Sequence, residues 1–181
     1  PRQVGSTMKP IGAYALALEK NKINWSTPLL DAPVRQLEDE KTGELKDWPA
    51  NFSKTYAEDD ILVVDALAQS INTIAVRVGE QAGVGNIYRF MKNSLGVTSL
   101  TPEDNDSGPM ILGSQTHGIS PYELAGAYMM LGNGGSFTTL HCYTSVQTGY
   151  GREIAAPELK TKQVLGTDTA YVMNRLLAQV M

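Results

Sequence analysis

At 181 residues with 42% hydrophobic content, the chain is long enough to bury a sizeable core and too apolar to be disordered. Its formal net charge is -4, and its 15 basic residues are scattered along the sequence, which argues against a nucleic-acid partner. The single cysteine excludes an internal disulfide. His117 and His141 each stand alone, without a second ligand at zinc-binding spacing, so the sequence predicts no metal site. The sequence contains no run of about 18 apolar residues, so it predicts no membrane-spanning helix.

The first predicted helix runs from about residue 6 to about residue 20. Apolar residues recur there at helical spacing, at Ile11, Tyr14, Ala15 and Leu18. Residues 24–56 lose this period and are rich in proline, aspartate and asparagine. This composition predicts a long irregular surface segment with at most a short strand or two.

Three helices are predicted next, over residues 57–69, 72–82 and about 87–95. The first of them is expected to carry the acidic residues Glu58, Asp59 and Asp60 in its first turn, where the helix dipole favours negative charge. The loop Ser70-Ile71-Asn72 then joins two helices. If this loop is extended, the side chains of Ser70 and Asn72 lie on one face and that of Ile71 points toward the core. Ser70 and Asn72 also suit the end of one helix and the start of the next.

The clearest local signal is Ser120-Pro121-Tyr122-Glu123, which combines an N-cap serine, a proline at the first helical position and a glutamate three residues after the cap. It predicts a helix over residues 121–131. Residues 137–154 alternate loosely around a Gly-rich turn at 148–151, which predicts a β-hairpin. A last amphipathic helix is predicted from about residue 167 to the end of the chain.

Ser6 and Lys9 are the first candidates for chemistry. A helix brings positions i and i+3 onto one face, so a turn that begins near Gly5 places the serine hydroxyl beside the lysine amine. A neutral amine can take the serine proton, and burial or a second cation makes a lysine neutral by lowering its pKa. The pattern Ser-x-x-Lys also arises by chance, as an N-cap serine followed by a solvated lysine, so further motifs must decide.

Further motifs occur in a specific order, and with them the chain resembles the transpeptidase domain of class A, bifunctional penicillin-binding proteins. Residues 5–11 are similar to the nucleophile motif of that family, and residues 68–72 to its second motif about sixty residues later. The other matching stretches are Trp48-Pro49-Ala50-Asn51, Leu112-Gly113-Ser114, residues 118–125, Tyr128 and Gly132-Asn133-Gly134-Gly135.

The resemblance implies an α+β fold. It makes residues 1–181 a partial transpeptidase domain, truncated at both ends, that contains mainly the helical subdomain of the penicillin-binding and serine β-lactamase-like fold. A peripheral β-hairpin is expected and most of the central sheet is expected to be missing. The remainder of the domain would then be supplied by complementary polypeptides, or the chain is a fragment that keeps its helical core.

The third motif of the family, Lys-Thr-Gly, is expected on a central strand after the other two. Lys41-Thr42-Gly43 has this sequence but stands between the first two motifs, in a segment without a strand pattern. We interpret it as a coincidental surface tripeptide, which places the real motif just past Met181. Without that motif the chain alone is expected to react poorly with a β-lactam.

The resemblance implies four catalytic residues and no metal or organic cofactor. Ser6 would attack the D-alanyl-D-alanine terminus of a peptidoglycan stem peptide, and Lys9 would be the base. Ser70 would relay a proton to the leaving group, Asn72 would hold the acyl-chain amide, and the Ser6 backbone N–H would give half of the oxyanion hole. β-Lactam antibiotics would stop the reaction at the acyl-enzyme. The parent protein is expected to be membrane-anchored, at the outer face of the bacterial cytoplasmic membrane.

Three other functions fit parts of the sequence. A β-lactamase would hydrolyse its acyl-enzyme, but Ile71 replaces the aspartate that class A β-lactamases have there, and no glutamate is evident for a deacylating water. A β-lactam-binding sensor would keep the first two motifs, and residues 112–135 favour a transpeptidase over it. In a helical scaffold without an active site, Ser6→Ala would be silent in every ligand assay.

Overall fold

The computed structural model describes residues 1–39 and 41–180. A helical run occupies the middle of the molecule and begins as the 3-10 turn η1 (Gly5–Thr7). It continues through the π-helical segment η2 (Pro10–Tyr14) into α1 (Ala15–Glu19). The helix predicted over residues 6–20 is therefore present, although only its last part is a regular α-helix.

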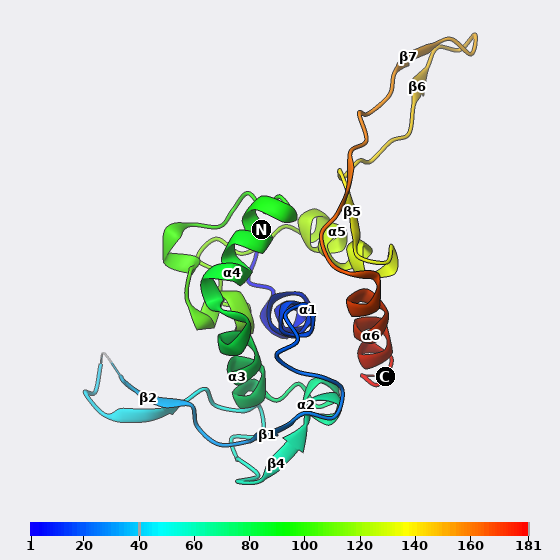
Figure 1. Ribbon diagram of the computed structural model, residues 1–181. Helices are drawn as coiled ribbons and strands as arrows, with labels where there is room; N and C mark the ends of the chain where they lie inside the picture. The colour runs from blue at the N-terminus through cyan, green and yellow to red at the C-terminus, as the bar shows by residue number, and fades with distance from the viewer. Residues whose placement is uncertain (40, 181) are drawn as a thin grey trace.

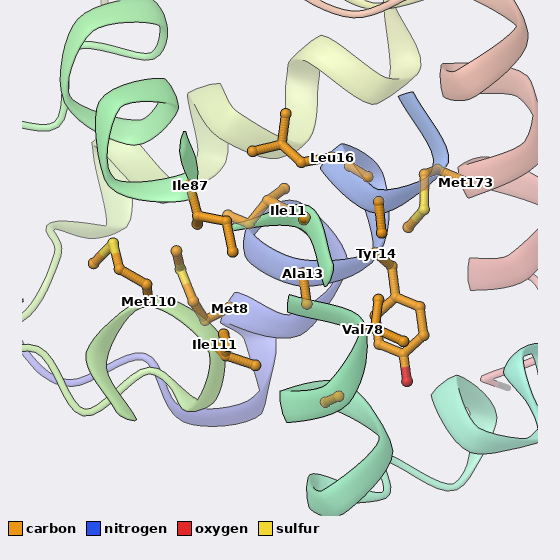
Figure 2. Close-up of a cluster of buried hydrophobic side chains, with 14 of the residues drawn as sticks. Met8, Ile11, Ala13, Tyr14, Leu16, Val78, Ile87, Met110, Ile111 and Met173 are labelled. Atoms are coloured by element: carbon orange, nitrogen blue, oxygen red, sulfur yellow. The ribbon is translucent and has the colours of Figure 1, made fainter. Parts of the chain in front are cut away.

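The middle part of this central run is buried on every side. All residues from 8 to 17 are buried, which is the pattern of a helix that other elements surround rather than of one that lies on a surface. Its apolar side chains meet those of the surrounding helices in one cluster, in which Val78, Ile87 and Met173 come from different elements (Figure 2). The position of the Lys9 backbone is thus fixed by the core itself.

The remaining helices wrap around this run, with α3 and α4 on one side and α5 and α6 on the other (Figure 1). Their bounds are α2 (Val63–Ala68), α3 (Asn72–Ala82), α4 (Val84–Arg89), η3 (Phe90–Ser94), η4 (Pro102–Asp104), η5 (Gly108–Leu112), α5 (Pro121–Gly132) and α6 (Thr167–Leu177). The helices predicted over 72–82, 87–95 and 121–131 are confirmed. The last helix begins at Thr167 as predicted but ends at Leu177 instead of running to the end of the chain. In the described part of the chain, no helix is long and apolar enough to cross a membrane.

Strands form only short pairs around these helices. Within residues 1–39 and 41–180 there are four two-stranded antiparallel sheets. The pairs are β1 (Pro28–Leu30) with β4 (Asp60–Leu62), β2 (Arg35–Glu38) with β3 (Leu45–Trp48), β5 (Ser136–Thr138) with β8 (Thr161–Gln163), and β6 (Val146–Gln147) with β7 (Glu153–Ala155). The fold is therefore α+β, as predicted; that most of a central sheet is missing stays a prediction.

Two predictions about the strands and their neighbours were wrong, and a third was confirmed only in part. The helix predicted over residues 57–69 begins only at Val63, because residues 60–62 pair with β1 instead of forming a first helical turn. Residues 24–56 hold three strands rather than one or two. The predicted hairpin is present, since the turn at 148–151 joins β6 to β7, but Phe137 lies outside it and pairs with Lys162 in a second pair of strands beside α5. The β6–β7 ribbon projects from the helices (Figure 1).

Candidate active site

Lys9 is the centre of the candidate site. Its side chain is 1% exposed, and its Nζ donates hydrogen bonds to the Ser70 carbonyl oxygen at 2.6 Å and to Ser70 Oγ at 2.9 Å. Burial lowers the pKa of Lys9 to about 8. A neutral amine has two N–H groups, so these two bonds use both and leave the nitrogen lone pair free to accept a proton.

Ser6 lies one helical turn before Lys9 and is exposed to solvent. Among the described residues, Ser6 Oγ and Lys9 Nζ are not joined by a hydrogen bond, so the direct contacts of the amine are with Ser70. The i, i+3 spacing still keeps the serine and the lysine on one side of the helical run. A reactive serine must be reachable by its substrate, and the exposure of Ser6 meets that need.

The turn from Gly5 to Lys9, which we call the Ser6–Lys9 turn, is held by the segment that precedes α5. The Gly5 N–H donates to the Gly113 carbonyl at 3.1 Å, and Gly113 has a left-handed φ of 78°. A Cβ atom on Gly113 would overlap the backbone of Gly5. Only glycine can take this conformation and permit this close approach without strain.

A second tie to the same turn comes from α5. The Tyr128 hydroxyl donates to the Thr7 carbonyl at 2.7 Å, and burial raises the pKa of Tyr128 to about 12, so the hydroxyl stays protonated and able to donate. A short antiparallel bridge between Arg2 and Ile119 fixes the chain just before the turn. The residues of the 112–128 region that the resemblance singled out therefore contact the turn that carries Ser6.

Ser70 occupies an unusual backbone position at the end of α2. Its φ is 56°, in the left-handed region. Its N–H donates to the Leu67 carbonyl, and the Ile71 N–H donates to the Ala66 carbonyl, which is the Schellman pattern that terminates a helix. The prediction of an extended loop was therefore wrong at Ser70, because the helix-ending turn determines its conformation; Ile71 is nevertheless packed inward, at 9% exposed.

Asn72 is the first residue of α3 and is tied to the segment after β3. Its side-chain Nδ2 donates to the Ala50 carbonyl at 2.7 Å, and its backbone N–H donates to Asn51 Oδ1 at 3.0 Å. One side-chain N–H and the Oδ1 acceptor of Asn72 are not used in these bonds. The structure thus joins Lys9 to Ser70 directly and places Asn72 two residues further on.

A cavity of about 330 Å³ opens beside Ser70. It lies between the segment after β3 and the loop that joins α2 to α3. Its lining includes Asn51, Phe52, Tyr56, Gln69 and Ser70. Ser70 therefore borders this cavity as well as contacting Lys9.

Lys41-Thr42-Gly43 lies in the turn of the β2–β3 hairpin, and all three residues are exposed. The N–H groups of Lys41, Thr42 and Gly43 donate to Asp39, so they stabilise the hairpin turn itself. Contrary to our prediction there are strands on either side of the tripeptide. That the true third motif lies elsewhere stays a prediction.

The sequence did not reveal the roles of Asp31 and Tyr128. Asp31 is only 4% exposed although it lies in a segment predicted to be irregular surface. Tyr128 was part of a matching stretch, but no local pattern indicates that its hydroxyl reaches the Ser6–Lys9 turn. Both contacts join residues that are distant in sequence, so only the folded structure displays them.

A buried lysine of lowered pKa, bonded to a second serine and one turn after an exposed serine, is the arrangement that serine acyl-transfer chemistry needs. The whole chain, residues 1–181, matches the family described as the penicillin binding protein transpeptidase domain. The chain belongs to this family, as its motifs predicted.

Individual relatives agree with this assignment. The chain is 30% identical to penicillin-binding protein 1B of Haemophilus influenzae over 171 residues, which are 94% of this chain and 21% of that protein. It is 29% identical to penicillin-binding protein 1F of Bacillus subtilis over 180 residues, 99% of this chain and 23% of the relative. The chain thus spans about a fifth of the length of the curated relatives that it matches.

Solved structures show the same fold. Penicillin-binding protein 1A from Haemophilus influenzae superposes with a TM-score of 0.79 at 22% identity, over 98% of this chain and 29% of that one. The imipenem acyl-enzyme complex of penicillin-binding protein A from M. tuberculosis gives 0.75 at 18% identity, over 98% of this chain and 43% of that one.

Proposed function

We propose that this chain carries the serine and the base of a D,D-transpeptidase that cross-links peptidoglycan stem peptides through an acyl-enzyme. The observation that carries the proposal is the buried Lys9 amine, with its two bonds to Ser70 and its lowered pKa. Membership of the penicillin-binding transpeptidase family supports the substrate class. Because peptidoglycan lies outside the cytoplasmic membrane, we place the protein that carries this chain there.

In the first step, Ser6 Oγ attacks the carbonyl carbon of the penultimate D-alanine while the neutral Lys9 amine takes the hydroxyl proton. The Ser6 N–H lies in the first turn of the helical run, where N–H groups lack intrahelical partners, so it can stabilise the developing oxyanion. The peptide C–N bond then breaks, and Ser70 Oγ passes a proton from Lys9 to the departing D-alanine amine. Its 2.9 Å contact with Lys9 Nζ supplies the path.

Asn72 holds the stem peptide during this step. Since one N–H of its side chain already binds Ala50, its Oδ1 and remaining N–H are the groups that can pair with an amide of the acyl chain. In the second step the amine of a neighbouring stem peptide attacks the carbonyl carbon of the Ser6 ester and gives a proton to Lys9. The bond from this carbon to Ser6 Oγ then breaks, Lys9 returns the proton to Ser6 Oγ, and the cross-link is complete. A β-lactam follows the first step and then stays attached to Ser6.

The test is release of D-alanine from a D-alanyl-D-alanine stem-peptide analogue by the native polypeptide that contains this chain. We expect release in the wild type and loss of at least about a thousandfold in Ser6→Ala. The lifetime of the benzylpenicillin adduct separates the nearest alternatives: hydrolysis within seconds would indicate a β-lactamase. A stable adduct without any reaction of the peptide would indicate a sensor.

A further inference from the structure

We propose that Asp31 and Asn51 are positioning residues that hold the Ser70–Asn72 loop, so that Asn72 meets the amide of the acyl chain. This inference rests on the function proposed above. It starts from Asp31, a carboxylate that is 4% exposed and has no part in the acyl-transfer steps. A buried charge is costly unless it is fully hydrogen-bonded, so its partners indicate what it stabilises.

Asp31 collects donors from three separate parts of the chain. Its Oδ1 accepts from Thr73 Oγ1 at 2.5 Å and from Asn51 Nδ2 at 2.8 Å, and its Oδ2 accepts from the Ala57 N–H at 2.8 Å. Burial acts to raise the pKa of Asp31, but these bonds, with the nearby Arg77 charge, hold it below its usual value. Asp31 is therefore an ionised anchor, placed directly after β1.

Asn51 extends this anchor to the start of α3. Its Nδ2 is held by Asp31, which turns its Oδ1 toward the helix, where it accepts from the N–H groups of Asn72 at 3.0 Å and Thr73 at 3.4 Å. The N-cap residue of α3 is Ile71, whose side chain cannot accept a hydrogen bond. Asn51 thus supplies from another segment the cap that Ile71 lacks.

The loop is consequently fixed from two directions. Lys9 holds Ser70 from the central helical run, while Ala50 and Asn51 hold Asn72 from the segment after β3. In Figure 1, β1 lies beside the beginning of α3, where this second anchor sits. If the Asp31–Asn51 contact is lost, Asn72 loses both its cap and the alignment of its side chain, whereas the Lys9–Ser70 contact remains.

This asymmetry predicts a selective defect. Asn72 is proposed to bind the acyl-chain amide, which benzylpenicillin has and 6-aminopenicillanic acid lacks. In the native polypeptide that contains this chain, Asn51→Ala should slow acylation by benzylpenicillin about tenfold or more. Acylation by 6-aminopenicillanic acid should change less than about threefold. The ratio of the two rates is a quantity that general destabilisation would not alter.

Asn86→Ala is the matched control. Asn86 lies in α4, and its Nδ2 donates to the carbonyl of Ala82, the last residue of α3, at 2.9 Å, so this variant removes an asparagine that stabilises the opposite end of α3. It should lower the melting temperature but leave both acylation rates within about twofold. If Asn51→Ala does not fold, Asp31→Asn, which keeps the side-chain shape, is expected to lower the same ratio about threefold or more.

Two results would overturn the inference, and they have different consequences for the proposed function. If the wild type is acylated and the variants at Asn51 and Asp31 keep its rate ratio, the positioning role is wrong while the proposed function stands. If the wild type is not acylated at Ser6 by either compound, the proposed function fails and the positioning role falls with it.

Discussion

The pH dependence of Ser6 acylation tests whether Lys9 is the base. With a pKa of about 8 instead of the usual 10.5, about a tenth of Lys9 is neutral at pH 7, about 300 times more than for an unshifted lysine. The neutral form is the active one, so the acylation rate should rise about tenfold per pH unit below 7, about fivefold from pH 7 to 8, and level off above 9.

The assay is the rate of benzylpenicillin labelling, measured at pH values from about 6 to 9.5 in the native polypeptide that contains this chain. Lys9→Arg is the control, because an arginine keeps the positive charge but cannot lose its proton. It should be labelled at least about a thousandfold more slowly at every pH, with thermal unfolding used to show that it is folded. A flat profile, a midpoint near 10.5, or wild-type labelling of Lys9→Arg would refute the reasoning.

Three further predictions concern the turn that carries Ser6. Gly113→Ala should lower the free energy of unfolding by about 2–3 kcal/mol, and with it the melting temperature, because the new Cβ would overlap the facing backbone at a position with left-handed φ. Gly149→Ala is the control: it has open space around it and should melt as the wild type does. Tyr128→Phe removes the hydrogen bond that ties α5 to this turn. It should lower the free energy of unfolding in urea by about 1 kcal/mol and slow acylation severalfold. Unchanged acylation would exclude a role for the hydroxyl. Between about pH 8 and 10.5, the free energy of unfolding of the wild type should rise relative to that of Lys9→Met, because in this window the unfolded state holds a proton on Lys9 that the folded state has lost. A parallel pH dependence in the two proteins would contradict the lowered pKa of Lys9.

Elements whose signals are local could be predicted from the sequence. The helix after Ser120 is the clearest case, because the serine and Glu123 satisfy each other's backbone N–H groups within four residues. The central run was also predicted, although the complete burial of residues 8–17 was not. Its spacing indicates one apolar face, and only the surrounding helices bury the other faces.

Elements that depend on distant partners could not be predicted. The acidic residues at 58–60 suit a helix start, yet Asp60 pairs with Leu30 in a strand, and no local rule reveals that pairing. The β2–β3 hairpin was missed because every residue of β2 is exposed, so no apolar alternation marks it.

The candidate site likewise has residues that could be predicted from short motifs and features that depend on the folded structure. Ser6, Lys9, Ser70 and Asn72 were found from short motifs, and the structure places Lys9 in contact with Ser70. The left-handed backbone of Ser70 was missed because serine is uncommon where a Schellman turn usually has glycine. Asp31 was missed because its burial results from three contacts that span 20 to 42 residues of sequence.

The measurement that tests the central claim most directly is the intact mass of the native polypeptide before and after excess benzylpenicillin, followed by peptide mapping. The account predicts one penicilloyl group per chain, attached to Ser6 and absent from Ser6→Ala. No adduct, or an adduct that persists in Ser6→Ala, would contradict it.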